Sequence, residues 1–266
     1  MPSRKAAERF DGTAEYYARY RPGYGGPAFA YLAERFDLDD QTRVLDLGCG
    51  TGHVAIPVAG YAGEVVGMDP NEEMLAVARE RAVAAGRENV EWVRGSDSDL
   101  DESLGPVRLA TLGRSFHWMD QERTLERLFR MADPKGGVAI LTDRDWLLRG
   151  EEEWQADVYD VAGGYLDDLP ERTGPEVEYD DPWDELVAEH GFTDVEVTRF
   201  ESRREWTVER IVGYVFSLSF GSPRRFGDDA AAFEAAVRER LADRGERPFV
   251  QDATVEVITG RRESAD

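Results

Sequence analysis

VLDLGCGTG at residues 44–52 decides the fold, because a short apolar strand over residues 43–47 runs directly into a glycine cluster. Glycines at a strand-to-helix turn let the backbone approach a ligand that a Cβ atom would block. A helix predicted over residues 53–60 begins after the turn, and its first N–H groups lie free for hydrogen bonding. The stretch therefore indicates a nucleotide-type binding site at the carboxyl end of a strand.

Outward from this turn, strands and helices alternate up to residue 143. Further strands are predicted over residues 64–68, 90–94, 107–112 and 137–142, and residues 125–131 form the core of a helix. Asn71 is the predicted N-cap of another helix, which ends near Gly86. Four apolar residues share one face of that helix: Met74, Leu75, Ala78 and Ala82.

The second half of the chain interrupts this pattern twice with helical segments. A helix over 183–190 and strands over 195–200 and 254–259 resume the sheet, with helices over 208–220 and 230–244 between these strands. We therefore expect an α/β fold of the doubly wound, Rossmann-like kind, a mostly parallel seven-stranded sheet with helices on both faces. Helical insertions follow the fifth strand and separate the last two strands.

The whole chain, residues 1–266, is expected to form one domain, since its length suits one sizeable core. Residues 1–40 are predicted as N-terminal lid helices and 41–144 as the cofactor-binding core. The insertions at 145–181 and 207–245 are predicted to form a substrate cap.

Composition favours a soluble, cytoplasmic protein, either a monomer or a homodimer. Hydrophobic residues make up 41% and charged residues 33% of the chain, and no apolar run approaches the roughly 18 residues of a membrane span. The N-terminal stretch has no apolar segment typical of a signal peptide, and Cys49 is the sole cysteine, so no internal disulfide forms.

The formal net charge of −23 argues against a nucleic-acid partner, which needs a basic face. Lysine occurs only at Lys5 and Lys135, so arginine supplies nearly all of the positive charge. An acidic, lysine-poor surface also suits a salt-rich cytoplasm, because salt screens the repulsion between like charges. A halophilic source and a merely acidic bacterial protein are the two interpretations.

The spacing of the glycine loop, G-x-G-x-G, differs from the G-x-G-x-x-G that holds a dinucleotide pyrophosphate. Asp46 precedes the loop and can face the ammonium group of an amino acid moiety, whereas it would repel a pyrophosphate. Asp69, at the end of the second strand, can accept hydrogen bonds from both hydroxyls of a ribose.

With these motifs the sequence resembles the class I S-adenosylmethionine (SAM)-dependent methyltransferases, in the small-molecule branch that includes trans-aconitate methyltransferases. VLDLGCGTG at 44–52, VVGMDPNEEML at 65–75 and SFHWMD at 115–120 carry the resemblance. The resemblance implies SAM as cofactor. It implies that Asp46, Gly48 and Gly50 bind the methionine part of SAM. It also implies that Asp69 binds the ribose and that Pro70 and Met74 flank the adenine.

Two further cofactor contacts depend on the same resemblance. GSDSDL at 95–100 aligns with the GDAEDL of similar enzymes, whose first acid contacts adenine. Because Ser96 replaces that acid here, the adenine contact is assigned to Asp97, and a polar loop that caps a helix is the alternative. Residues 10–24 resemble a lid segment, in which Phe10, Tyr17 and, one helical turn later, Tyr20 or Arg21 lie over the cofactor. An aromatic stripe packed in the core is the alternative. An aromatic face near a sulfonium gains cation–π attraction.

Residues facing the acceptor are expected after the fourth strand and in the cap. His117 is the candidate general base, and Phe116 and Trp118 line the acceptor pocket beside it. Trp206 and Tyr214 are the preferred cap residues of that pocket. For each of them, packing in the core is the alternative.

The predicted reaction is in-line transfer of a methyl group from SAM to an oxygen or nitrogen atom of a small molecule. A carboxylate is one acceptor that the resemblance suggests. The reaction needs no metal, and His53, His117 and His190 show no metal-ligand spacing. A non-catalytic SAM-binding protein and a nicotinamide-dependent oxidoreductase of the related fold are the alternatives.

Overall fold

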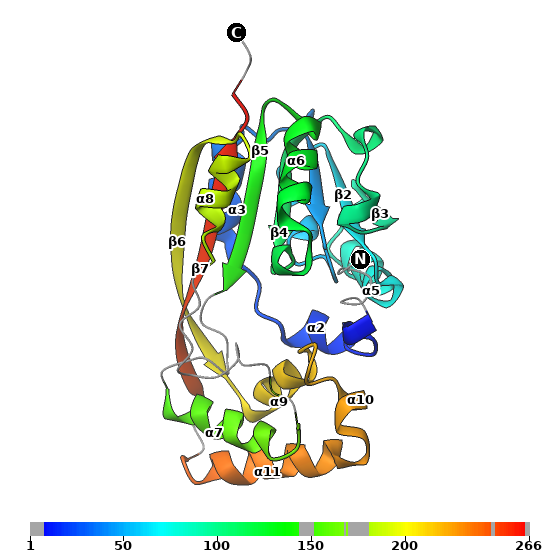
Figure 1. Cartoon of the computed structure of the whole chain (residues 1–266). Coiled ribbons are helices and arrows are strands. Elements are labelled where there is room, and N and C mark those ends of the chain that lie inside the picture. Colours follow the sequence, from blue (N-terminus) through cyan, green and yellow to red (C-terminus); the bar gives the residue numbers. More distant parts are fainter. Residues whose placement is uncertain (1–7, 144–151, 168, 170–180, 246–247, 264–266) are drawn as a thin grey trace.

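A seven-stranded sheet forms the upper half of the molecule, and a helical cap forms the lower half (Figure 1). The computed structural model describes residues 8–143, 152–167, 169, 181–245 and 248–263. The strand order is β3-β2-β1-β4-β5-β7-β6. The strands are β1 (Arg43–Leu47), β2 (Glu64–Asp69), β3 (Val90–Arg94), β4 (Val107–Gly113), β5 (Ala132–Asp143), β6 (Thr193–Trp206) and β7 (Phe249–Arg261).

The first five strands are parallel, and β7 runs antiparallel to both of its neighbours, β5 and β6. This arrangement confirms the predicted mostly parallel, doubly wound sheet. Because the chain order reverses between β1 and β4, a crevice opens at the carboxyl ends of these two strands, where such sheets bind ligands.

Helices cover both faces of the sheet, and adjacent residues of one strand serve opposite faces. Val44 packs with α3 (Gly26–Arg35) and α4 (Ala55–Val58), whereas Leu45 packs with α6 (Gln121–Met131) and α8 (Trp183–Glu189). Helix α5 (Glu72–Ala84) follows β2. Its N-cap is Asn71, whose side chain accepts a hydrogen bond from the Met74 N–H, and all four apolar residues predicted for its inner face are buried.

Helix α3 corrects the prediction that residues 1–40 form a lid. Phe29 and Leu32 on this helix are buried in the same cluster as Val44 and Leu109 of the sheet. We therefore keep the name lid for the 3-10 turn η1 (Glu8–Phe10) and helix α2 (Ala14–Tyr20), and a closing role for this segment stays a prediction. In Figure 1, α2 lies between the sheet and the cap.

The cap has its own apolar core, built from α7 (Glu153–Gly163), α9 (Val208–Phe216), α10 (Pro223–Phe226) and α11 (Ala230–Ala242). Pairing of β5 with β7 ends at Asp143 and Val255, but β6 and β7 stay paired down to Trp206 and Phe249. This two-stranded extension, residues 201–206 and 249–254, leads from the sheet into the cap (Figure 1). Most of the predicted 145–181 insertion, with Trp146, lies outside the described residues.

Across the part of the chain that the structure describes, no helix combines the length and the apolar character needed to cross a bilayer.

Candidate functional site

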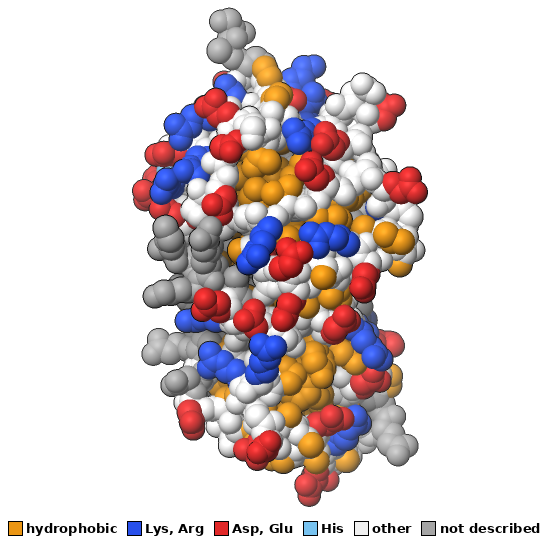
Figure 2. Space-filling model, turned by 90° about the vertical axis from the view of Figure 1, so that its right-hand side faces the viewer, with side chains coloured by type: hydrophobic (Ala, Val, Ile, Leu, Met, Phe, Trp, Pro, Cys, Tyr) orange, Lys and Arg blue, Asp and Glu red, His pale blue; other side chains and the backbone are white. Residues whose placement is uncertain are grey.

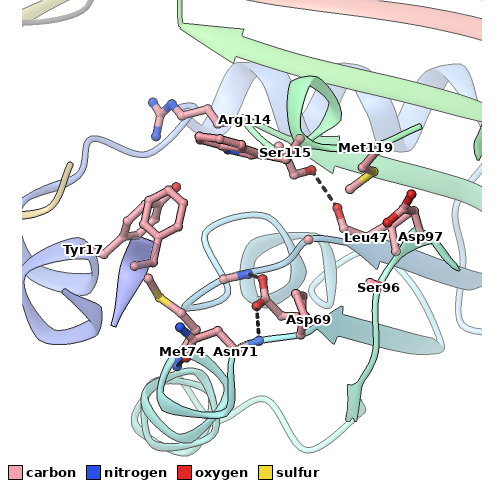
Figure 3. Close-up of a pocket in the computed structure, with 16 residues that line it drawn as sticks. Tyr17, Leu47, Asp69, Asn71, Met74, Ser96, Asp97, Arg114, Ser115 and Met119 are labelled. Atoms are coloured by element: carbon pink, nitrogen blue, oxygen red, sulfur yellow. Dashed lines mark hydrogen bonds between the residues drawn. The ribbon is translucent and has the colours of Figure 1, made fainter. Parts of the chain in front are cut away.

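A pocket opens at the carboxyl ends of β1, β2, β3 and β4, with the lid along one side (Figure 3). Its cavity volume is about 90 Å³, and the pocket is partly open to solvent. Its lining residues are Phe10, Tyr17, Leu47, Gly48, Gly50, Asp69, Pro70, Asn71, Met74, Ser96, Asp97, Gly113, Arg114, Ser115, Trp118 and Met119.

Gly48 brings the backbone of the glycine loop against the end of β4. Its φ of +71° lies in the left-handed region that favours glycine, and a Cβ atom there would lie 2.5 Å from Cβ of Ser115. The Ser115 hydroxyl in turn donates a hydrogen bond to the Leu47 carbonyl at 2.8 Å. The loop thus presents backbone rather than side chains to the pocket.

Asp69 lies at the base of the pocket, where its carboxylate joins the glycine loop to helix α5. One oxygen accepts a hydrogen bond from the Gly50 N–H at 2.9 Å, and the other accepts one from the Asn71 N–H at 2.8 Å (Figure 3). Burial raises the pKa of Asp69 to about 6, although these two hydrogen bonds oppose the shift. Each oxygen keeps lone pairs for further donors, such as ligand hydroxyls.

Asp46 lies outside the pocket lining, which corrects its predicted contact with the ammonium group of a ligand. Its side chain is buried, and its two oxygens accept hydrogen bonds from the Ala55 N–H and the Thr111 hydroxyl, both at 2.9 Å. Burial raises its pKa to about 7, and the charge of Asp69 adds to the shift. Asp46 therefore ties the start of α4 to β4.

Pro70, Met74 and Asp97, the residues predicted to contact adenine, all line the pocket. One oxygen of Asp97 accepts a hydrogen bond from the Asp120 N–H at 3.2 Å. Its other oxygen is buried and has no hydrogen-bond partner among the described residues. A buried carboxylate oxygen without a donor is costly, so this atom indicates a donor on the ligand.

The lid contributes Phe10 and Tyr17, whose rings lie 6.2 Å apart edge to face. Phe10 also contacts Trp118 across the pocket mouth, at 5.9 Å between ring centroids. Arg21, predicted beside Tyr17 over the cofactor, is not in the lining. Its guanidinium lies instead between the rings of Tyr17 and Tyr214, at 5.0 and 4.9 Å from their centroids.

Most of the predicted acceptor residues need correction. Phe116 is fully buried against Trp183. His117 is absent from the lining, and its ring centroid lies 4.9 Å from that of Trp118. Trp206 is buried in the cap core, where its indole N–H donates to Gln251. Tyr214 belongs to the same core, and its hydroxyl lies 3.4 Å from the guanidinium of Arg21.

Trp118 remains in the lining, together with residues that the sequence did not single out. Ser115 and Met119 belong to the SFHWMD motif, so that motif predicted the location but not which side chains face inward. Asn71 was interpreted only as a helix cap. Among the described residues, no three His, Cys, Asp or Glu side chains form a group that could hold a metal ion.

Sheet order, glycine loop and strand-end acid together define the nucleotide-binding fold of class I methyltransferases. Residues 44–136 match a family model described as a methyltransferase domain. The family model and the relatives support a class I SAM-dependent methyltransferase, with SAM as the cofactor. The narrower likeness to trans-aconitate methyltransferases stays a prediction.

Relatives support this family over different lengths of the chain. An uncharacterized methyltransferase-like protein of Schizosaccharomyces pombe is 27% identical over 206 residues, which cover 77% of this chain and 75% of that protein. A demethylmenaquinone methyltransferase of Shouchella clausii is 32% identical over 112 residues, 41% of this chain and 48% of the relative. The solved YcgJ protein of Bacillus subtilis shares the fold, with a TM-score of 0.57 at 16% identity, covering 91% of this chain and 100% of that one.

Proposed function

We propose that this enzyme binds SAM in the pocket at the ends of β1 to β4 and transfers the methyl group to an oxygen or nitrogen atom of a small molecule. The observation that carries the proposal is Asp69, a buried carboxylate at the base of a pocket whose loop presents backbone groups. A carboxylate in this position suits the two hydroxyls of a ribose.

The other walls of the pocket fit the rest of SAM. Gly48 and Gly50 line the pocket without side chains, so the methionine part can approach the loop backbone. Pro70 and Met74 offer apolar contacts to adenine, and the unpartnered Asp97 oxygen can accept a hydrogen bond from its amino group. Tyr17 presents an aromatic ring to the pocket, where it can attract the positive sulfur.

Bound SAM supplies a methyl group already activated by a positively charged sulfur. The chain then has to align the acceptor in line with this group and to exclude water. Phe10, Tyr17 and Trp118 suit the second task, because their rings meet at the pocket mouth. His117 is no longer the candidate base, since it lies outside the lining.

The test is a product assay combined with calorimetry. We expect SAM and S-adenosylhomocysteine to bind and NAD not to bind, and we expect S-adenosylhomocysteine to form with some small acceptors of a broad panel. Binding of NAD instead of SAM would contradict the cofactor site. SAM binding without product from any small acceptor would contradict a small-molecule acceptor.

A further inference from the structure

His53 follows the glycine loop directly and lies outside the pocket lining, with a partly buried ring. Its Nδ1 lies 3.1 Å from the hydroxyl of Thr51 and 3.4 Å from a guanidinium nitrogen of Arg81, which reaches the loop from α5. The Arg81 guanidinium also donates hydrogen bonds to the carbonyl and the hydroxyl of Thr51. The ring is therefore held on one side by the glycine loop and by α5.

These contacts determine which ring nitrogen of His53 carries the proton. A guanidinium has only donors, so Nδ1 accepts, and the proton of the neutral ring is on Nε2. Burial lowers the pKa of His53 well below its ordinary value, and three nearby guanidinium groups add to the shift, those of Arg81, Arg114 and Arg21. The ring is therefore neutral at neutral pH, with one acceptor and one donor.

The donor of this ring is used by the lid. Arg21 is the C-cap of helix α2, and the last carbonyls of a helix have no partner within the helix. The Arg21 N–H already donates to the Tyr17 carbonyl at 3.2 Å, so the hydrogen bond between His53 and the backbone of Arg21 is one that the ring donates to the Arg21 carbonyl. His53 thus holds the end of α2 against the glycine loop.

The same ring packs against Tyr17, the lid residue that faces the pocket (Figure 3). The centroids of the His53 and Tyr17 rings lie 5.5 Å apart, edge to face. The guanidinium of Arg21 lies over the Tyr17 ring at 5.0 Å, and a Cβ atom on Gly50 would lie 3.9 Å from Cε1 of Tyr17. The Tyr17 ring is therefore held beside the part of the loop that the methionine part of SAM approaches in the proposed function.

We propose that His53 is a positioning residue, which holds the ring of Tyr17 against the positively charged sulfur of SAM. This inference rests on the proposed function, in which Tyr17 attracts that sulfur, and it adds the residue that orients the ring. His53 acts through Tyr17 and needs no contact with the cofactor. A ring that is oriented before SAM binds avoids the entropic cost of ordering it on binding.

The ratio of the affinities for SAM and S-adenosylhomocysteine tests the inference without turnover. The two ligands differ in the methyl group and in the positive charge on sulfur, so the cation–π attraction of Tyr17 contributes to SAM binding alone. In His53→Ala we expect SAM to bind about 3- to 30-fold more weakly and S-adenosylhomocysteine to bind as in the unaltered protein. Calorimetry measures both affinities. Because the lost ring is neutral, its removal changes no charge beside the pocket.

Tyr17→Leu shows whether His53 acts through the ring of Tyr17. We expect this variant to lower the ratio in the same direction, and we expect the double variant to have the ratio of Tyr17→Leu alone. His190→Ala is the matched control, because it removes a histidine at the end of α8 whose ring also contacts a backbone carbonyl, that of Leu186. If His53→Ala does not fold, His53→Leu takes its place, since leucine fills more of the space without a donor or an acceptor.

The two proposals fail differently. Three results would overturn the positioning role and leave methyl transfer untouched: an unchanged ratio in His53→Ala, an equal change of the ratio in His190→Ala, or a further fall when His53→Ala is added to Tyr17→Leu. Absence of SAM binding to the unaltered protein would instead overturn the proposed function.

Discussion

Asp46 shows how one residue of a recognised motif can serve the fold rather than the ligand. Its carboxylate accepts hydrogen bonds from α4 and β4 inside the protein, away from the pocket. The residue type and its place before the glycine loop predicted a contact with the ammonium group of the ligand, whereas the carboxylate pairs with the Ala55 N–H and the Thr111 hydroxyl. They could not distinguish a donor on the backbone from a donor on the ligand, because both satisfy a buried carboxylate.

The raised pKa of Asp46 predicts that stability depends on pH. The pKa of Asp46 is about 7 in the folded state, against its ordinary value of 3.8. Between pH 3.8 and about pH 7, the folded state therefore holds a proton that the unfolded state has lost. Unfolding free energy should therefore rise as pH falls from about 8 to about 5, with at most about 4 kcal/mol from this group.

Asp46→Asn is the variant that isolates this contribution, since the amide can still accept from Ala55 and donate to Thr111. Denaturant unfolding of both proteins over the same pH range gives the measurement. We expect the variant to lose part of the pH dependence, and parallel curves for the two proteins would count against a buried, charged Asp46.

Asp69→Ala should weaken SAM binding by roughly 1.5–3 kcal/mol, because the ribose loses its acceptor. In the unaltered protein SAM affinity should also fall as pH drops through about 6, where the carboxylate of Asp69 takes up a proton. Calorimetry measures both effects. Glu80→Gln, on the exposed side of α5, is the control, and equal affinity in Asp69→Ala and the control would remove Asp69 from the site.

At the level of elements, the lid and the cap are in contact through helices α2 and α9, which approach each other closely. Helices α2 and α9 meet at Gly213, where a Cβ atom would lie 2.3 Å from Cδ2 of Tyr20. The Arg19 guanidinium pairs with Glu209 of α9 at 2.8 Å, and Tyr16 contacts Phe216 at 5.3 Å. The position of the lid over the pocket therefore follows from its packing on the cap.

Gly213→Ala should displace α2 and so weaken SAM binding. Overpacking typically costs about 1–3 kcal/mol, which sets the upper limit of the expected loss. Calorimetry measures the affinity, and hydrogen exchange in α2 reports the displacement. Gly163→Ala in α7 is the control, because its Cβ atom would meet only an ordinary contact of 3.5 Å. If both variants bind SAM equally, the contact with Tyr20 does not hold the lid.

The strands and helices around the pocket could be predicted from the sequence, because each shows its pattern of apolar residues within a few neighbouring positions. Strands β1 and β3 have the expected bounds, and Asn71 caps α5 as expected. Strand β6 is much longer than predicted, since its residues alternate charged and half-buried side chains instead of forming an apolar run. The orientation of Phe116 and Trp206 into cores depends on tertiary packing, which spacing along the chain does not encode.

At the scale of the whole molecule, 55 acidic residues outnumber 32 basic ones. Figure 2 shows acidic side chains from the top to the bottom of one face, over both the sheet and the cap. At a net charge of −23, repulsion between the acidic side chains destabilises the compact folded state.

Salt should stabilise the protein if this charge is an adaptation to a salt-rich cytoplasm. At about 1 M KCl the Debye length falls to roughly 3 Å, so repulsion between surface carboxylates is screened. We expect the melting temperature to rise by at least about 3 °C between low salt and molar KCl. A flat or falling curve would favour an acidic protein from an ordinary cytoplasm.

Trp118, one of six tryptophans in the chain, stands at the pocket mouth with Phe10 of the lid. Its indole is consequently a built-in optical reporter, whose emission should change when a ligand displaces water from the pocket or when the lid shifts. Titration of SAM against the unaltered protein and against Trp118→Phe would separate this signal from that of the buried Trp154, Trp183 and Trp206. The same signal, followed after rapid mixing, would give the rate of the change at the pocket on SAM binding. A change in emission that persists in Trp118→Phe would show that it arises elsewhere.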